Sequence, residues 1–597
     1  MQTKLYMGNE LIALGALDAG VNVVTGYPGT PSTEVLETIA KYNDGSVYVE
    51  WSVNEKAALE VAAGASYAGA RSLVTMKQVG LNVASDPLMS LSYIGVKGGM
   101  VIVVADDPGP ISSQTEQDTR TFGMYSKVPV FDPATPEEAY EMMSYAYRIS
   151  ERYETPVIMR PTTRICHACA SFSPLGKHTE KKAEGFVKDP KWVIFPRLAY
   201  MSHLKVEKRA KELSEEFSSY DKNFAVGSGK KAAACSGVSV SYVKEALRDI
   251  GEDIKMLKIA TPFPFPEKLA VDFLGSVDEI LVFEELDPYL ERQLIYLCGK
   301  YKLNVNIHGK LDSTTPEAGE NSVMSVKRAL SKFLGKSEET QQELPPAPPL
   351  PVRPPVLCAG CPHRASFYAV KQAMKGKKAL FSGDIGCYTL GNAMPLDTTD
   401  TCLCMGAGLT LAQGIGKVEP DFKCFSFTGD STFFHTGIVG IANAVYNGAD
   451  MTAVILDNST TAMTGHQPNP STGRNAMGEF AAKISIEKVL EGLGVTDIQT
   501  VDPLEHDKAV AAAKRAAETK GVSAIIYRSE CIALIKDPKP YAVDKEKCIG
   551  CKKCIKELGC PAVVKDEDKV AIDASLCTGC SLCSQICPVN AIVKEDR

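Results

Sequence analysis

Residues 423–458 read KCFSFTGDSTFFHTGIVGIANAVYNGADMTAVILDN, and their pattern indicates the fold class of the chain. It begins with a predicted strand that ends in Gly429-Asp430, continues as a helix of small and apolar residues, and closes with a second strand. Such a unit belongs to an open parallel sheet, in which ligands bind beyond the carboxyl ends of the strands. We therefore expect a binding site where Asp430 and Asn458 follow the two strands.

The residue types at these strand ends predict a site for Mg²⁺ and a phosphate group. Mg²⁺ prefers hard oxygen ligands, and phosphate oxygens complete its octahedron. The carboxylate of Asp430, the amide oxygen of Asn458 and a nearby backbone carbonyl supply three ligands. Gly429 lets the backbone approach a phosphate closely. Two ordinary strand–helix turns remain the alternative, because a Gly-Asp pair is common.

The N-terminal part of the chain shows the same alternation of strands and helices. Five apolar runs there predict strands, with helical stretches between them. They are VNVVTGY (21–27), SVYVEW (46–51), SLVTM (72–76), MVIVVAD (100–106) and PVIMR (156–160). We predict an α/β fold of parallel sheets flanked by helices, followed by a small C-terminal α+β domain.

The chain has 597 residues, a length that fits several domains. Shifts in composition divide it into six segments. We expect an α/β domain at 1–170, a charged connector with a surface helix at 171–230, a second α/β domain at 231–335, an extended Pro-rich linker at 336–356, a third α/β domain at 357–535 and a Cys-rich unit at 541–597.

Composition excludes several classes of partner. The formal net charge of −7 gives no electrostatic case for nucleic acid or an anionic membrane as a partner. No apolar run is long enough for a membrane span, which takes about 20 residues. The N-terminal stretch lacks an apolar signal core, so we expect a cytoplasmic protein. Its 19 cysteines then point to metal and not to disulfides.

The C-terminal unit carries the spacing of two iron–sulfur clusters. Its two runs are Cys548-x2-Cys551-x2-Cys554-x5-Cys560-Pro561 and Cys577-x2-Cys580-x2-Cys583-x3-Cys587-Pro588. The second run has the bacterial [4Fe–4S] spacing, in which the fourth Cys ligates the other cluster. This assigns one cluster to Cys548, Cys551, Cys554 and Cys587, and the other to Cys577, Cys580, Cys583 and Cys560. A structural zinc site is the alternative, but zinc usually takes four ligands in paired arrangements.

Residues 423–458 also resemble the cofactor motif of thiamine diphosphate enzymes, which reads GDG and, one helix and one strand later, NN. This sequence has Gly429-Asp430-Ser431 and Asp457-Asn458 at these places. It departs from the motif at the third glycine and at the first asparagine. The resemblance implies that Asp430 and Asn458 bind the metal through their side chains, and Thr460 through its carbonyl.

Thiamine diphosphate enzymes also need a carboxyl group against the aminopyrimidine ring of the cofactor. Its hydrogen bond favours the imino tautomer, which takes the C2 proton of the thiazolium, while the cofactor carries the hard chemistry. Glu55 is the candidate, because it follows the run SVYVEW and opens a helix of small residues. Glu60 is the second choice. A surface role for Glu55 is the alternative, as for most glutamates.

The segment GYPGTPSTE (26–34) resembles the GYP-x-TPS motif of the 2-oxoacid:ferredoxin oxidoreductases, which lies near the substrate carboxylate. The resemblance makes Thr30 a candidate substrate contact, although a Gly/Pro turn before a capped helix also explains these residues. His435 and His466 lie close to the metal motif, and either could move protons. His466 therefore joins Glu55 and Thr30 as a candidate catalytic residue.

In the same family, a Cys-x2-Cys pair and two later cysteines hold a further cluster near the thiazolium ring. The corresponding residues here are Cys358, Cys361, Cys387 and Cys531. Such a cluster would take electrons singly and pass them to the C-terminal pair. A set of buried or loop thiols is the alternative.

The order of segments resembles, over essentially the whole chain, the alpha subunits of the indolepyruvate branch of this family. The three α/β domains then correspond to a pyrimidine-binding, a transketolase C-terminal-like and a diphosphate-binding domain. The implied reaction is oxidative decarboxylation of an aryl 2-oxoacid with coenzyme A, giving acyl-CoA, CO₂ and reduced ferredoxin.

The resemblance also implies cofactors and partners. The cofactors are thiamine diphosphate, Mg²⁺ and two [4Fe–4S] clusters, with the third cluster as an addition. The partners are a smaller beta (gamma-type) subunit in an (αβ)₂ assembly and ferredoxin as electron acceptor. Three alternatives stay open: another 2-oxoacid, a non-redox thiamine diphosphate decarboxylase, and an electron-transfer subunit without catalysis of its own.

Overall fold

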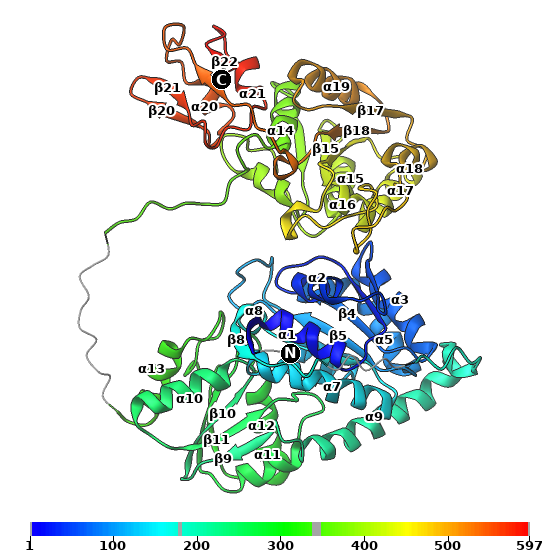
Figure 1. Ribbon diagram of the computed structural model, residues 1–597, viewed down its shortest axis with the longest axis vertical. Helices are drawn as coiled ribbons and strands as arrows, with labels where there is room; N and C mark the ends of the chain where they lie inside the picture. The colour runs from blue at the N-terminus through cyan, green and yellow to red at the C-terminus, as the bar shows by residue number, and fades with distance from the viewer. Residues whose placement is uncertain (1–2, 177–181, 337–347, 595–597) are drawn as a thin grey trace. The chain divides into compact units, whose positions relative to one another are not determined.

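The computed structural model describes residues 3–176, 182–336 and 348–594. It divides into two compact units, Met1–Ala347 (unit 1) and Pro348–Arg597 (unit 2), shown in Figure 1. Within the predicted linker, residues 337–347 lie outside the described residues, whereas 348–356 are exposed and form no helix or strand. Among the described residues, no helix is both long and apolar enough to cross a membrane.

The first sheet of unit 1 has six strands in the order β3-β2-β4-β5-β7-β6, and every neighbouring pair runs parallel. The five strands predicted from the apolar runs are confirmed as β2, β3, β4, β5 and β7. Every residue of β5 is buried, as expected for a strand with helices on both faces. The strands are β2 (Val23–Gly26), β3 (Tyr48–Trp51), β4 (Ser72–Lys77), β5 (Met100–Ala105), β6 (Val130–Phe131) and β7 (Val157–Met159).

Helices connect these strands. They are α1 (Gly8–Asp18), α2 (Thr33–Tyr42), α3 (Glu55–Tyr67), α4 (Gln78–Val83), α5 (Ser85–Ile94), α6 (Thr119–Ser126), α7 (Pro136–Tyr153) and α8 (Thr163–His167). An antiparallel pair, β1 (Lys4–Met7) with β8 (Cys169–Phe172), brings the two ends of this region together. The pair was not predicted, because its strands lie far apart in sequence.

The second sheet of unit 1 follows the order β13-β12-β10-β11-β9. Alternate residues of β10 enter two separate cores: Ala232 and Ala234 face α11 and α12, while Ala233 and Cys235 face α10 and α13. The edge strand β9 is antiparallel and comes from the segment expected as a connector, as does helix α9. The elements are α9 (Pro196–Phe217), β9 (Phe224–Val226), β10 (Lys231–Ser236), α10 (Ser239–Ile250), β11 (Lys255–Ile259), α11 (Glu267–Leu274), β12 (Glu279–Phe283), α12 (Tyr289–Tyr301), β13 (Asn306–His308) and α13 (Val323–Phe333).

Unit 2 contains a five-stranded parallel sheet in the order β14-β15-β16-β18-β17. Phe425 and Phe427 of β15 pack with α14 and α19 on one face, and Cys424 packs with α15 and α17 on the other. The strands are β14 (Ala379–Ser382), β15 (Lys423–Gly429), β16 (Met451–Asp457), β17 (Asp497–Val501) and β18 (Val522–Arg528). The main helices are α14 (Pro362–Ala373), α15 (Ala407–Val418), α17 (Ile438–Tyr446), α18 (Ile486–Gly492) and α19 (His506–Glu518).

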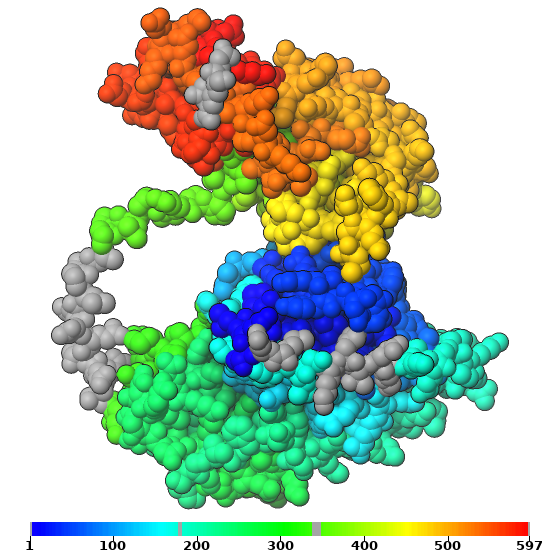
Figure 2. All heavy atoms as spheres, in the orientation of Figure 1, coloured from blue at the N-terminus to red at the C-terminus, as the bar shows by residue number. Residues whose placement is uncertain are grey.

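The C-terminal segment of unit 2 is a small α+β fold that packs directly on this sheet domain (Figure 2). Gln585 ties it to the start of α19, because its Oε1 accepts the His506 N–H at 3.0 Å and its Nε2 donates to the Leu504 carbonyl at 2.7 Å. The elements are β19 (Tyr541–Val543) paired with β22 (Ile592–Lys594), β20 (Val563–Asp566) paired with β21 (Lys569–Ile572), and the short helices α20 (Lys553–Lys556) and α21 (Leu582–Gln585).

Candidate functional site

Three neighbouring strands of unit 2 end in acidic side chains. Strands β14, β15 and β16 lie side by side and run parallel, so their carboxyl ends meet at one edge of the sheet. Asp384 follows β14, Asp430 follows β15, and Asp457 closes β16 just before Asn458; all four side chains are buried. Asp384 was missed by the sequence analysis, although Gly383 precedes it and repeats the Gly-Asp signal at a strand end.

Asp430 is a buried carboxylate with one open oxygen. Its Oδ1 accepts the backbone N–H of Ser431 at 2.8 Å, while Oδ2 has no hydrogen-bond partner of good geometry among the described residues. Burial and, second, the carboxylate of Asp457 raise the pKa of Asp430 to about 7. A bound cation would occupy the open oxygen and offset the repulsion between the two carboxylates. The donor set therefore fits Mg²⁺.

The other two predicted magnesium ligands, Asn458 and Thr460, lie on the loop after β16. Asn458 Nδ2 is 3.4 Å from His363 Nε2. Thr460 is buried, and its backbone lies close enough to the Asp430 carboxylate to lower the pKa of that group. The Thr460 carbonyl accepts the Ala462 N–H at 3.0 Å and keeps a second lone pair for another donor or a cation. The predicted ligands are thus gathered at one sheet edge.

Tyr388 lies against two glycines at this edge. Its hydroxyl donates to Asp384 Oδ1 and is 3.0 Å from Thr432 Oγ1. A Cβ atom at Gly429 would meet the ring at 2.6 Å, and one at Gly386 would meet it at 2.3 Å. Gly429 is therefore required by the tyrosine ring, a reason that the sequence did not reveal.

Glu55, the candidate partner of the aminopyrimidine, is the first residue of α3 and is buried, with 5% of its surface exposed. Asn54 caps the helix by accepting the Ala57 N–H. The Glu55 carboxylate packs on the backbone of Gly80, where a Cβ atom would lie 2.5 Å from Oε1. Glu60 is exposed and forms an ion pair with Lys56 at 2.7 Å, so burial favours Glu55 over Glu60.

Thr30, the candidate substrate contact, lies on the loop after β2, and its carbonyl accepts the Ser112 hydroxyl at 3.3 Å. Lys77, at the end of β4, packs along Gly29 and donates to the Ser112 carbonyl at 3.3 Å. Burial lowers the pKa of Lys77, and nearby acidic groups that include Glu55 oppose this effect. The fold thus brings the ammonium group of Lys77 close to Thr30 and Glu55, the two predicted site residues. Sequence reasoning missed Lys77.

The two histidines near the metal motif differ in burial. His435 lies in the π-helical turn η3 (Phe433–Gly437) and is buried, with Nδ1 3.4 Å from Thr436 Oγ1. His466 is exposed on the loop after β16. Its role in proton transfer stays a prediction. His363 is also buried, and burial lowers its pKa to about 4, so it is a neutral hydrogen-bonding group.

The four cysteines predicted for the third cluster come together from separate segments. Burial raises the pKa of Cys387 to about 11, with smaller contributions from the neighbouring thiols of Cys531 and Cys358. Cys358 likewise adds to the raised pKa of Cys361. The Cys531 N–H donates to the Asn458 carbonyl at 3.0 Å, which joins this thiol group to the candidate magnesium site.

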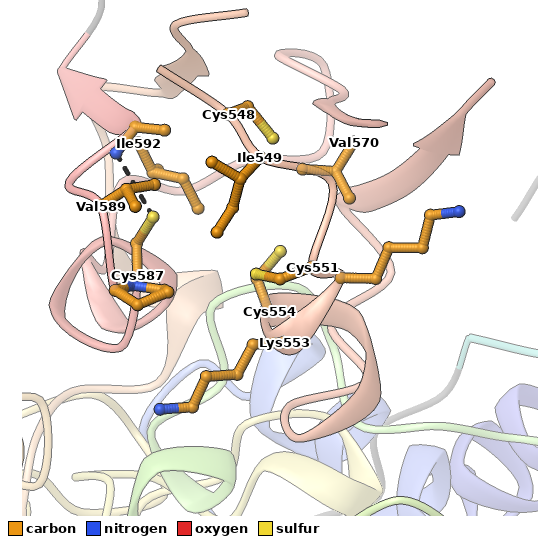
Figure 3. A pocket seen from close by; sticks show the side chains of 12 residues that line it. Cys548, Ile549, Cys551, Lys553, Cys554, Val570, Cys587, Val589 and Ile592 are labelled. Carbon is orange, nitrogen blue, oxygen red and sulfur yellow. Dashed lines mark hydrogen bonds between the residues drawn. The ribbon is translucent and has the colours of Figure 1, made fainter. Parts of the chain in front are cut away.

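The first predicted cluster of the C-terminal segment corresponds to one cavity, shown in Figure 3. Its wall contains all four assigned cysteines together with apolar side chains and two lysines. The residues are Cys548, Ile549, Cys551, Lys552, Lys553, Cys554, Val570, Cys587, Pro588, Val589, Ala591 and Ile592. The Ala591 N–H donates to Cys587 Sγ at 3.3 Å, a bond type that tunes cluster potentials.

The second assigned set is Cys560, Cys577, Cys580 and Cys583. Burial raises the pKa of Cys580 and Cys583, and the neighbouring thiols of Cys560 and Cys577 raise it further. Both residues are partly buried and pack against the apolar core of the sheet domain. Among the described residues, no three His, Cys, Asp or Glu side chains converge as ligands of a single ion would. A cubane instead spreads its thiolates around a cluster.

Three family models match the regions that carry these sites. Residues 14–193 match the thiamine diphosphate-binding region of pyruvate flavodoxin/ferredoxin oxidoreductases. Residues 384–527 match the C-terminal domain of thiamine pyrophosphate enzymes, which binds the cofactor. Residues 570–593 match the 4Fe–4S binding domain and include the second Cys run.

The chain also resembles curated proteins along almost its whole length. It is 41% identical over 573 residues to the indolepyruvate oxidoreductase subunit IorA of Methanothermobacter thermautotrophicus, which covers 93% of this chain and 91% of that protein. It is 39% identical over 599 residues to IorA of Pyrococcus horikoshii, with the same two coverages. The chain belongs to the IorA family. The 2-oxoglutarate synthase subunit KorA of Archaeoglobus fulgidus is 25% identical over only 52% of this chain and 96% of its own length.

IorA membership confirms the expected fold class and the class of enzyme. The chain is a subunit of a thiamine diphosphate-dependent 2-oxoacid:ferredoxin oxidoreductase that carries iron–sulfur chemistry in its C-terminal segment. Sequence reasoning thus identified the family correctly. The individual metal ligands, cluster ligands and catalytic residues stay predictions.

We expect cofactor binding to depend on the ionisation of Asp430. Because its pKa is raised to about 7, the metal-free carboxyl is protonated below that pH and must lose a proton to bind Mg²⁺. The affinity for Mg²⁺ with thiamine diphosphate should fall roughly tenfold per pH unit below 7, measured by titration calorimetry. In the metal-free protein, folded Asp430 keeps its proton up to a higher pH than unfolded Asp430 does, because its pKa is raised. The stability that this bound proton gives the folded state is therefore lost as the pH rises through about 7.

Asp430→Asn should abolish metal-dependent cofactor binding at every pH, because the variant has no carboxylate to ionise. Asp421→Asn is the matched control, because Asp421 is exposed and precedes the same strand. Normal cofactor affinity in Asp430→Asn would show that the metal lies elsewhere.

Gly80→Ala should displace the Glu55 carboxylate, because the new methyl group would overlap it. We expect thiamine diphosphate to bind while exchange of its C2 proton, followed by NMR, slows about 100-fold. Gly64→Ala is the control: Gly64 lies in the same helix as Glu55, and nothing stands within 4 Å of its added Cβ. Unchanged exchange in Gly80→Ala would argue against Glu55 as the proton-handling carboxyl.

Proposed function

We propose that this chain is the catalytic subunit of an enzyme that oxidatively decarboxylates an aryl 2-oxoacid of the indolepyruvate type. The 2-oxoacid and coenzyme A give an acyl-CoA, CO₂, a proton and two electrons, which reduce ferredoxin. The supporting observation is the contrast between two kinds of relative. Identity to indolepyruvate oxidoreductase subunits is 41% over nearly the whole chain, against 25% over half of it for the 2-oxoglutarate enzyme.

In this proposal the carboxyl edge of the unit 2 sheet holds the cofactor's diphosphate through Mg²⁺. Asp430 and Asn458 supply side-chain oxygens, Thr460 supplies a carbonyl, and Gly429 with Ser431 forms the turn beside them. Thiamine diphosphate, when bound, supplies the nucleophile for the keto carbon and the electron sink after CO₂ leaves. Glu55 holds a proton at the aminopyrimidine.

Oxidation of the substrate needs one-electron carriers. The proposed carriers are iron–sulfur clusters, which would be held by Cys358, Cys361, Cys387 and Cys531 and by the two cysteine sets in the C-terminal segment. A non-redox decarboxylase would have no use for these cysteine sets. A subunit that only transfers electrons would have no use for a buried carboxylate with an open oxygen at Asp430. A smaller beta subunit, in an (αβ)₂ assembly, completes the proposed enzyme.

The chain purified anaerobically with its beta partner should reduce a viologen dye when given indolepyruvate and coenzyme A. Comparison with pyruvate and 2-oxoglutarate tests the aryl preference, and omission of coenzyme A tests acyl transfer. Faster reduction with pyruvate would keep the reaction class and change the substrate. No reduction with any 2-oxoacid, despite bound cofactor and intact clusters, would overturn the proposal.

The proposed ferredoxin contact lies around the first C-terminal cluster. Between Lys547 and Lys556 the sequence has four lysines and no acidic residue, and Ile549 and Cys551 are exposed there. Electrostatic complementarity therefore favours an acidic partner. Lys553→Glu with Lys556→Glu should raise the KM for ferredoxin about tenfold at low salt and leave viologen reduction unchanged.

The matched control for this charge reversal is Lys514→Glu, because Lys514 is an exposed lysine on α19 of the same unit. An equal loss of activity with ferredoxin and with viologen would mean that the cluster, and not the docking, was damaged. An unchanged KM for ferredoxin would place the docking surface elsewhere.

A further inference from the structure

Arg364 joins two cysteine-bearing segments that are far apart in sequence. It lies on α14, and only 4% of its surface is exposed. Nη1 donates to the carbonyls of Leu558 at 2.6 Å and Gly559 at 3.0 Å. Nη2 donates to the carbonyls of Leu357 at 2.6 Å and Cys358 at 3.3 Å. One guanidinium therefore bridges the loop of Cys358 and the segment that leads into Cys560.

The remaining donor of this guanidinium has no acceptor of its own. Arg364 Nε is buried and lacks a hydrogen-bond partner among the described residues. A buried donor without an acceptor is destabilising. Burial raises the pKa of the thiols of both Cys361 and Cys580, and the positive charge of Arg364 opposes that rise at each, so sulfur lies near it on both sides. An anionic sulfur of a bound cluster is the kind of acceptor that this site lacks.

The two Cys-x2-Cys loops beside Arg364 also touch each other. Gly360 adopts a φ of 74°, and a Cβ atom there would lie 1.7 Å from Thr578 Oγ1. Thr578 stands between Cys577 and Cys580 in the second loop. Cys361 and Cys580 both pack against the same apolar core. The contact leaves no space for a side chain at Gly360, so the two loops have a fixed separation.

We propose that Arg364 is a positioning residue between two iron–sulfur clusters and that its charge sets their reduction potentials. One cluster is held by Cys358, Cys361, Cys387 and Cys531, and the other by Cys560, Cys577, Cys580 and Cys583. This inference rests on the proposed function, because both clusters belong to it.

The physical reason is the change of charge on reduction. Each cluster gains one negative charge when it accepts an electron, and a nearby cation in a water-poor interior stabilises the reduced form. The guanidinium of Arg364 stays protonated in both the oxidised and the reduced protein, because arginine does not lose its proton in proteins. Its planar fork also binds carbonyls of both loops at once, which a lysine ammonium does not reproduce. Arg364 thus combines a fixed charge with a fixed geometry.

The test is an EPR-monitored redox titration of the holoenzyme with its beta partner, comparing Arg364→Met, Arg364→Lys and wild type at equal iron content. Arg364→Met should lower the midpoint potentials of the two adjacent clusters and leave that of the Cys548 cluster unchanged. Arg364→Lys should restore most of the potential while the magnetic coupling between the two clusters stays weaker than in wild type.

Lys371→Met is the matched control. Lys371 lies two turns further along α14, and its Nζ donates to the carbonyls of Pro395 at 2.9 Å and Leu396. It therefore binds a loop as Arg364 does, but neither of its two acceptor residues is next to a cysteine in sequence, and its loss should leave all potentials unchanged.

Unchanged potentials in Arg364→Met at full iron content would overturn the inference. If Arg364→Met does not assemble, wild-type coupling in Arg364→Lys would overturn the positioning role. An equal shift in Lys371→Met would also contradict it, by showing that any lost cation on α14 has this effect. If wild type itself lacks the signal of a third cluster, the proposed function fails at that point, an outcome visible before any variant is measured.

Discussion

Negative charge buried at the carboxyl edge of one parallel sheet constrains the rest of unit 2. Asp384, Asp430 and Asp457 follow three adjacent strands, and burial is the main cause that raises the pKa of Asp384 and Asp430 to about 7. Asp457 is compensated by Arg528, whose Nε donates to it at 2.7 Å, and Asp384 by the hydroxyl of Tyr388. Of the three, Asp430 is the one with an oxygen, Oδ2, that has no hydrogen bond of good geometry among the described residues, while the Asn469 side chain and the Thr460 backbone lie close enough to lower its pKa. This uncompensated charge supports the proposed cation site at the edge, and a cation there would in turn attract phosphate.

Much of this edge follows from local sequence. An apolar run that ends in Gly-Asp, a helix, and a second run that ends in Asp-Asn are enough to place Asp430 and Asn458 together, because parallel strands share a carboxyl edge. The two Cys runs of the C-terminal segment are equally local, and their spacing alone predicts the four cysteines that line the cavity around Cys548. Five of the six strands of the first sheet likewise followed from apolar runs in the sequence. Such features depend on neighbours in sequence.

The features that sequence reasoning missed depend on neighbours in space. His363 meets Asn458 across 95 positions, and Arg364 meets Leu558 across 194. Neither contact has a periodicity or a spacing that a single sequence displays. Gly80 is a similar case, since only the fold reveals that the Glu55 carboxylate occupies the space of its missing side chain. Asp384 differs, because its Gly-Asp signal was present and was overlooked in favour of the neighbouring Cys387.

The packing of the C-terminal segment gives its two cysteine sets different surroundings. Cys580 and Cys583 pack against the same core of the sheet domain as Cys361, and the charge of Arg364 acts on Cys580. The cavity around Cys548 instead has Lys552 and Lys553 in its wall and includes the exposed Cys551. Each of Cys560, Cys577, Cys580 and Cys583 is partly buried, whereas the Cys548 set combines the buried Cys554 with the exposed Cys551. A cluster held by the Cys548 set would therefore have one side screened by solvent and salt, and protein charges would act more strongly on a cluster packed against the sheet domain. In the proposed enzyme, the same small fold would thus offer one site suited to internal electron transfer and one suited to exchange with an external partner. The sheet domain creates this difference, because the two Cys runs are nearly equivalent in sequence.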